Sequence, residues 1–240
     1  MTQKHQFHRP DLEAADTLAT SRQLHHDLQR IISANSVILD VGANRGQFAE
    51  EVLQVLPGVR IYSFEPVPEA YEKLTLLSEK HPQVMPVKRA VSLRAGQSTF
   101  FVTASDVGSS LLEPLSNQPS QWLTLDKQIS VETIRLDNFI EKESLALGGV
   151  SLLKSDAQGS DLDVILSMGD FLNPQFLQSI LVEINFTEFY HGQQSYYDIF
   201  SALDSAGYRM AWMYPHRAHD EWLWWADILF IGKNRNDFFS

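Results

Sequence analysis

The stretch Ser36-Val-Ile-Leu-Asp40-Val-Gly42-Ala-Asn44-Arg-Gly46 decides the fold class of this chain. A short apolar run ends in a carboxylate, and a turn that contains two glycines follows it. Apolar residues then recur at helical spacing as far as Leu56. Strand, turn and helix are the simplest account, and this order is typical of the units that build parallel α/β sheets.

The same alternation extends on both sides of this unit. A helix is expected over 11–32, and the region 96–134 is less regular. After the first unit we expect strands over 59–64, 84–91, 97–103, 151–156, 180–186, 208–214 and 227–231, helices over 69–78, 136–140, 161–168 and 196–206, and a loop over 105–120. The sequence therefore predicts an α/β fold with a doubly wound, mostly parallel sheet and helices on both faces.

Composition narrows the classes of function. Lys and Arg number 19 against 30 Asp and Glu, a net charge of −11, and 44% of residues are hydrophobic. Such a chain packs as a globular protein, and its acidity disfavours nucleic acid and anionic membrane as partners. Cysteine is absent, and adjacent His25 and His26 point to different faces of a helix, so we predict no metal site.

The ends and divisions of the chain lead to further expectations. We predict a helical extension over 1–35 and one domain over 36–240, since no repeat or linker separates its parts. No apolar run reaches the roughly 20 residues of a spanning helix, and the N-terminal segment lacks the features of a secretory signal. A cytoplasmic location is the expectation.

Three carboxylates, Asp40, Glu65 and Asp156, follow predicted strands. In a doubly wound sheet, ligands bind beyond the carboxyl ends of the strands. Glu65 lies 23 residues after Gly42, near the spacing at which an acid reaches a ribose hydroxyl. Together these residues predict a nucleoside site, although Glu65-Pro66 is also compatible with a simple end of a strand.

The kind of nucleoside follows from the glycine turn. Asn44 occupies the position of the middle glycine in the dinucleotide pattern, and Asp40 ends the strand. A carboxylate would repel a pyrophosphate but attract a cationic amino acid group. This chemistry favours S-adenosylmethionine over a nicotinamide dinucleotide.

Five strings of this sequence together resemble the FkbM-type methyltransferases, over about residues 37 to 233. They are Val-Ile-Leu-Asp-Val-Gly-Ala-Asn-Arg-Gly (37–46), Ser-Phe-Glu-Pro-Val-Pro-Glu (63–69), Thr-Ile-Arg-Leu-Asp-Asn-Phe (133–139), Leu-Leu-Lys-Ser-Asp-Ala-Gln-Gly-Ser-Asp-Leu (152–162) and Val-Glu-Ile (182–184). The resemblance implies a class I methyltransferase fold, which is Rossmann-like with seven strands, one of them antiparallel. It also implies methylation of hydroxyl oxygens from S-adenosylmethionine, with S-adenosylhomocysteine as product.

The same resemblance assigns roles by position. Residues 40–46 would hold the methionine portion, Glu65 the ribose, and Asp156 would lie beside the sulfonium. The family usually shows Asp-x-Glu-Gly where this chain has Gln158, which removes a charge and puts a role as base or metal ligand in doubt. The expected cofactor-binding residues are Asp40, Gly42, Ala43, Asn44, Gly46, Gln47, Glu65, Pro66, Ala90, Asp156 and Gln158.

Candidate catalytic bases are Asp156, Glu188 and His191. The last two follow a predicted strand, on the side where an acceptor would enter, but each alone is more typical of a surface loop than of a catalytic base. His216 and His219, in a predicted loop after Tyr214, have the same two interpretations.

Four tryptophans gather near the C-terminus, and they are compatible with acceptor contact or with a dimer interface. They are Trp212, Trp222, Trp224 and Trp225. The sequence thus predicts an S-adenosylmethionine-dependent O-methyltransferase that acts on a sugar, a glycan, or a glycosylated or polyketide-type natural product. A nicotinamide-dependent oxidoreductase and a non-catalytic S-adenosylmethionine-binding protein are the alternatives.

Overall fold

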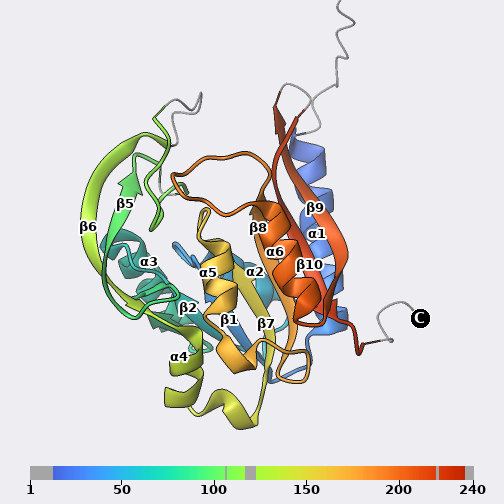
Figure 1. Cartoon of the computed structure of the whole chain (residues 1–240). Helices are drawn as coiled ribbons and strands as arrows, with labels where there is room; N and C mark the ends of the chain where they lie inside the picture. Colours follow the sequence, from blue (N-terminus) through green and yellow to red (C-terminus); the bar gives the residue numbers. More distant parts are fainter. Residues whose placement is uncertain (1–12, 106, 117–122, 220–221, 236–240) are drawn as a thin grey trace, which may run out of the picture.

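The computed structural model describes residues 13–105, 107–116, 123–219 and 222–235, and a seven-stranded sheet forms its centre (Figure 1). Its order is β3-β2-β1-β7-β8-β10-β9, and β10 is antiparallel to both of its neighbours. The remaining neighbours are parallel. The strands are β1 (Val37–Val41), β2 (Arg60–Phe64), β3 (Val84–Val87), β7 (Val150–Ser155), β8 (Leu177–Asn185), β9 (Tyr208–His219) and β10 (Trp222–Gly232). The predicted α/β sheet with one antiparallel strand is confirmed.

Helices cover both faces of this sheet. They are α1 (Glu13–Ile31), α2 (Gln47–Val55), α3 (Pro68–Lys80), α4 (Leu136–Lys142), α5 (Asp161–Leu166) and α6 (Tyr196–Ser205), with short 3-10 turns at Leu145–Leu147 and Gly169–Phe171. In Figure 1, α5 and α6 lie in front of the sheet and α2 lies behind it. The predicted start of this helix at Asp11 lies outside the described residues.

Two hydrophobic clusters form because strand side chains alternate between the faces. Leu39 packs with α4, α5 and α6, whereas its neighbour Ile38 packs with α1, α2 and α3. Leu28 and Ile31 of α1 belong to the second cluster and are buried. The N-terminal helix is therefore part of the packed core.

A second, three-stranded sheet differs from the prediction. It has the order β4-β6-β5, with β4 (Ala90–Val91), β5 (Gly96–Thr103) and β6 (Leu125–Ile134). The predicted strand 84–91 is thus wrong as one element, because β3 and β4 belong to different sheets. Strand β6 was missed because most of its residues are exposed and its pattern is polar. In Figure 1, β5 and β6 curve as a wall on one side of the molecule.

The C-terminal hairpin is longer than predicted. Strand β9 continues to His219, which pairs with Trp222 at the start of β10. The predicted loop that contained His216 and His219 is therefore wrong. The polar stretch after Tyr214 lacks the apolar alternation by which strands are recognised, and only its pairing with β10 identifies it.

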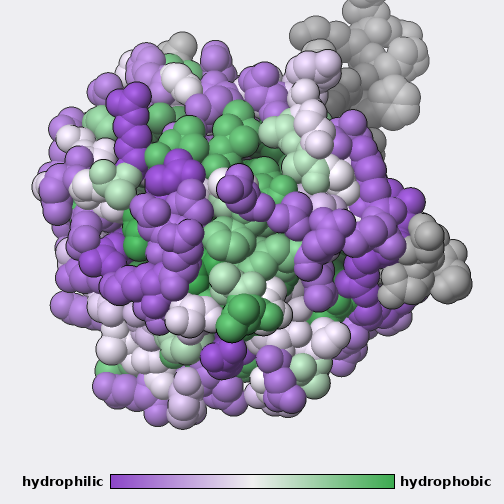
Figure 2. Space-filling view, turned by 60° about the horizontal axis from the view of Figure 1, so that its bottom comes forward, coloured by the Kyte–Doolittle hydropathy of each residue, from purple (hydrophilic) through white to green (hydrophobic). Residues whose placement is uncertain are grey.

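Two further features concern the hydrophobicity of the helices and of the surface. None of the helices in the described part of the chain combines the length and apolar character needed to cross a bilayer. Figure 2 shows a hydrophobic area in the middle of one face, bordered by hydrophilic residues.

Candidate functional site

The loop between β1 and α2 has a backbone that glycine suits. Gly42, Asn44 and Gly46 all have positive φ, at 73°, 50° and 91°. The backbone N–H groups of Gly42 and Ala43 donate to the carbonyl of Phe64, at 3.2 and 3.0 Å. The loop is thereby fixed against the end of β2.

Protein atoms occupy the space that a side chain would take at either glycine. A Cβ on Gly42 would lie 1.9 Å from the carbonyl oxygen of Asp156, and one on Gly46 would lie 2.4 Å from Leu77 Cδ2. The residue that follows β7 thus lies against Gly42, and α3 lies against Gly46.

Glu65 is a buried carboxylate at the end of β2. It accepts backbone hydrogen bonds from Asn44 at 2.9 Å and from Val67 at 2.8 Å. Burial raises the pKa of Glu65 to about 7, against the opposing effect of these two bonds. A carboxylate has about four acceptor positions, so this one retains capacity for ligand hydroxyls.

Lys154 lies between two carboxylates on adjacent strands. Its Nζ atom is 3.7 Å from Asp40 Oδ1 and 3.4 Å from Asp156 Oδ2, and it donates to the carbonyl of Gly42 at 3.2 Å. Burial alone would lower the pKa of Lys154, but the surrounding carboxylates outweigh it and raise this pKa. The lysine is therefore charged, and it neutralises part of an acidic site.

A row of polar side chains crosses the sheet beside this lysine. Strand register pairs Glu183 of β8 with Asp227 of β10, and Asp227 with Tyr214 of β9. Because paired residues lie on the same face, these side chains form one line across three strands. Asp156, at the end of β7, continues the line.

The side chain of Gln158 connects two members of this row. Its Nε2 atom donates to Asp156 Oδ1 at 2.7 Å and to Glu183 Oε1 at 2.8 Å. The hydroxyl of Tyr190 donates to Gln158 Oε1 at 2.9 Å. The glutamine is thus a bridge between two carboxylates.

A cavity of 860 Å³ joins the β1 loop to this polar row. Its lining includes nine of the eleven predicted cofactor-binding residues: Gly42, Ala43, Asn44, Gln47, Glu65, Pro66, Ala90, Asp156 and Gln158. Asp40 and Gly46 do not line it. Asp40 is fully buried and accepts a hydrogen bond from Ser63 Oγ at 3.2 Å. It also forms an ion pair with Lys154.

Two of the predicted catalytic candidates lie away from the cavity. Glu188 and His191 are exposed and are not part of its lining. Tyr190 between them is buried, because the chain pairs here with Pro114 and the N–H of His191 donates to Glu113. Of the three candidates, only Asp156 is at the cavity.

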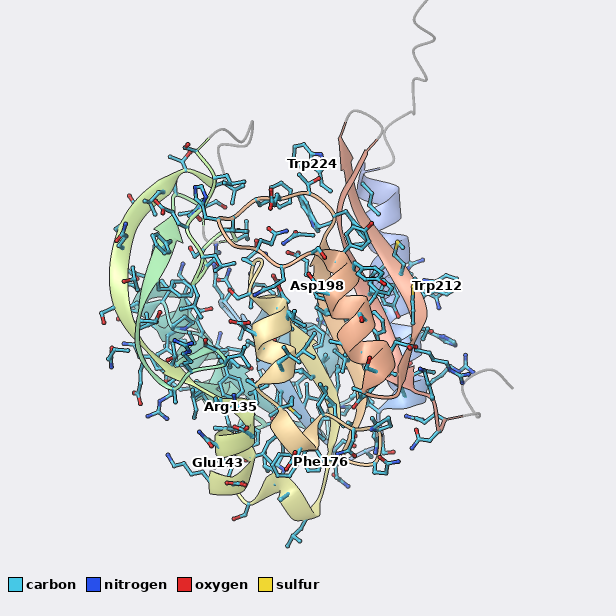
Figure 3. All side chains as sticks on the ribbon, viewed as in Figure 1. Arg135, Glu143, Phe176, Asp198, Trp212 and Trp224 are labelled. Carbon is cyan, nitrogen blue, oxygen red and sulfur yellow. The ribbon has the colours of Figure 1, made fainter. Side chains whose placement is uncertain are left out.

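The tryptophans of the tail have different surroundings. Trp225 lines the cavity, and Trp224 and Trp225 pack edge-on against Phe189 at ring distances of 5.8 and 6.0 Å. Trp212 is 51% exposed and points away from the sheet on the outer side of β9, whereas Trp224 lies at the far end of the hairpin (Figure 3). Trp225 is therefore placed for ligand contact and Trp212 is not.

Sequence reasoning missed several residues that line the cavity. They are Leu24, Lys154, Glu183, Tyr214 and Asp227. Lys154, Glu183 and Asp227 could have been detected, since a charged residue inside an apolar strand is rare without a partner or a function. Within the described part of the chain, no group of three or more His, Asp or Glu side chains is arranged to hold a metal ion.

Comparisons with known proteins agree with this geometry. The Methyltransferase FkbM domain matches residues 40–210. The 2-O-methyltransferase NoeI of Sinorhizobium fredii is 28% identical over 183 residues, which cover 72% of this chain and 74% of NoeI. The hexuronic acid methyltransferase AglP of Haloferax volcanii is 24% identical over 152 residues, which cover 63% of this chain and 56% of AglP.

Solved structures show the same architecture. Fibrillarin from Aeropyrum pernix, solved with natively bound S-adenosyl-L-methionine, superposes with a TM-score of 0.51 at 16% identity. The match covers 90% of this chain and 74% of fibrillarin. At this identity the likeness concerns the fold alone.

Proposed function

This chain belongs to the FkbM family of S-adenosylmethionine-dependent methyltransferases, and we propose that it methylates a hydroxyl oxygen of a sugar, a glycan or a glycosylated natural product. The observation that carries the proposal is the continuous cavity, which joins Glu65 at one end to the row Asp156, Glu183 and Asp227 at the other. The relatives act, by their names, on a 2-hydroxyl group and on a hexuronic acid.

The residues of the β1 loop and the end of β2 suit the cofactor. Glu65 is a carboxylate fixed by two backbone N–H groups, and its remaining acceptor positions fit the two hydroxyls of a ribose. Asp156 and Glu183 place negative charge further along the cavity, where a sulfonium or an ammonium group is attracted. S-adenosylmethionine, when bound, supplies a methyl group on a good leaving group.

The polar row suits an acceptor that carries several hydroxyls. Carboxylates accept hydrogen bonds from sugar hydroxyls, and Trp225 adds an aromatic face to the same lining. In the lining as a whole, acidic side chains outnumber basic ones, so the cavity disfavours an anionic acceptor. We infer that a neutral sugar is preferred over a hexuronic acid.

Alignment supplies a large part of the catalysis, since a sulfonium leaves readily. The side chains of the cavity hold the acceptor oxygen in line with the transferred methyl group and exclude water from it. The proton of the hydroxyl then needs an acceptor within hydrogen-bonding distance.

Formation of S-adenosylhomocysteine across an acceptor panel tests this function. The panel contains neutral methyl glycosides, the matching uronates and glycosylated natural products, and we expect turnover with the neutral members and less with each matched uronate. Calorimetry should show binding of S-adenosylhomocysteine and none of NAD. Binding without turnover on any acceptor would instead support a non-catalytic cofactor-binding protein, and binding of NAD alone would support an oxidoreductase. Sedimentation would show whether the chain forms a homo-oligomer.

A further inference from the structure

We propose that Glu183 is the general base of the methyl transfer and that Gln158 positions it. The proposal rests on the function proposed above, and it names two residues to which the sequence-based assignment of the base gave no role.

The carboxylate of Asp156 is already engaged on both oxygens. Its Oδ2 atom lies 3.4 Å from the ammonium of Lys154, and its Oδ1 atom accepts from Gln158 at 2.7 Å. Each oxygen of Asp156 therefore already has a donor within the protein. Asp156 thus fits an electrostatic role better than a role as base.

Glu183 has one engaged oxygen and one available oxygen. Its Oε1 atom accepts from Gln158 at 2.8 Å, and its side chain lines the cavity. Within the described part of the chain, no hydrogen bond engages Oε2. This oxygen is therefore available to a hydroxyl in the cavity, while the bond to Oε1 fixes the direction of the carboxylate.

The position of Gln158 is itself held by its neighbours. Its backbone has φ of 51°, a left-handed value that is uncommon for a residue other than glycine. Ser110 Oγ donates to its carbonyl at 2.7 Å, and the Tyr190 hydroxyl donates to its Oε1. The two hydrogens of Nε2 are then directed at two carboxylates. Backbone strain that several contacts maintain is typical of functional sites.

Charged groups from every side act on Glu183. Burial is the largest effect and raises the pKa of Glu183, and the charges of Asp156, Asp227 and Asp161 raise it further, while Lys154 lowers it. The result is a pKa well above the ordinary value of a glutamate. A carboxylate of raised pKa is a more effective base near neutral pH than an ordinary one.

The step balances in atoms and charge. The acceptor oxygen forms a bond to the methyl carbon, and the bond from that carbon to sulfur breaks with its electron pair kept on sulfur. The hydroxyl proton passes to Oε2 of Glu183 and then to solvent. The products are the methyl ether, S-adenosylhomocysteine and one proton, which is first held by Glu183 and then released to solvent.

Replacing the proposed base is the first arm of the test. In Glu183→Gln, kcat on the best neutral acceptor should fall by about 10²- to 10⁴-fold. Affinity for S-adenosylhomocysteine should stay near that of the original protein, and the rise of kcat with pH should disappear. Glu141→Gln, an exposed carboxylate on α4, is the matched control and should retain full turnover. If Glu188→Gln loses turnover and Glu183→Gln keeps it, the assignment is wrong.

Replacing the positioning residue is the second arm. Gln158→Met keeps an unbranched side chain but removes both donors, so the ionised form of Glu183 loses a stabilising bond. The rise of kcat with pH should move to higher pH, and turnover should recover there. A uniform loss at every pH would show a merely structural role for Gln158. If Glu183→Gln turns over as fast as the original protein, the assignment of Glu183 as base is wrong but the proposed function stands. If the original protein is inactive on the whole panel, the proposed function is wrong as well.

Discussion

The hydroxyl of Tyr214 donates a 2.7 Å hydrogen bond to the carboxylate of Asp27, and this bond joins strand β9 to helix α1. Both residues are buried, and they lie 187 positions apart in the sequence. Tyr214 also lines the cavity, together with Leu24 of the same helix. A helix that lies before the family match at 40–210 thus forms part of the wall of the site.

Removing the Tyr214 hydroxyl should destabilise the protein. Tyr214→Phe leaves the buried carboxylate of Asp27 without its strongest partner, and a hydrogen bond to a charged group contributes about 1.5–3 kcal/mol. We expect a loss of that size in the free energy of unfolding, measured by urea denaturation at pH 7. Tyr197→Phe removes a hydroxyl from a residue that is 71% exposed and is the control. Equal effects of the two variants would show that the bond adds no stability.

Removing the carboxylate of Glu65 should weaken cofactor binding. If Glu65 accepts hydrogen bonds from the ribose hydroxyls, its loss removes about 1.5–3 kcal/mol, which corresponds to roughly ten- to a hundredfold in Kd. Calorimetric titration of Glu65→Ala with S-adenosylhomocysteine measures this change. Glu72→Ala, an exposed residue of α3, should bind normally. An unaltered Kd in a folded Glu65→Ala protein would rule out the ribose contact.

The raised pKa of Glu65 predicts two effects of pH. Because this pKa is about 7 and the ionised form accepts the ribose hydroxyls, affinity for S-adenosylhomocysteine should fall as the pH drops below about 7. The free energy of unfolding should change in the opposite direction and fall as the pH rises, because the pKa of Glu65 in the folded protein lies above its ordinary value of 4.5. The stabilisation from protonated Glu65 is complete below pH 4.5 and is lost as the pH rises to about 7. Both pH dependences should weaken in Glu65→Gln; if they persist unchanged, another group is responsible.

Gly42 should tolerate no side chain. Gly42 and Gly192 both have φ near 75°, so alanine at either position should cost about 1–2 kcal/mol for the left-handed backbone. A Cβ at Gly192 meets nothing within 4 Å, whereas one at Gly42 would lie 1.9 Å from the carbonyl of Asp156. Gly42→Ala should therefore lower the melting temperature clearly more than Gly192→Ala. Similar melting temperatures would show that the loop can move away from β7 at little cost.

The amino-acid sequence was sufficient for most strands of the main sheet and for much of the end of the cavity that contains Glu65. Both depend on short-range patterns: an apolar strand, a glycine turn and a carboxylate such as Glu65 follow one another within one strand-turn-helix unit. Such units have the same local geometry wherever they occur, because parallel strands place their carboxyl ends at one edge. The resemblance to the FkbM family reinforced these local patterns.

Only the tertiary structure decided which polar groups meet at the other end of the cavity. Glu183, Asp227 and Tyr214 come together through the register of β8, β10 and β9, and register between strands depends on pairing across long separations. Likewise, Glu188 and His191 lie near the right strand in sequence, but pairing of the chain with Pro114 buries Tyr190 and leaves both exposed. Contacts of this kind join residues that are distant in the chain, and no local pattern encodes them.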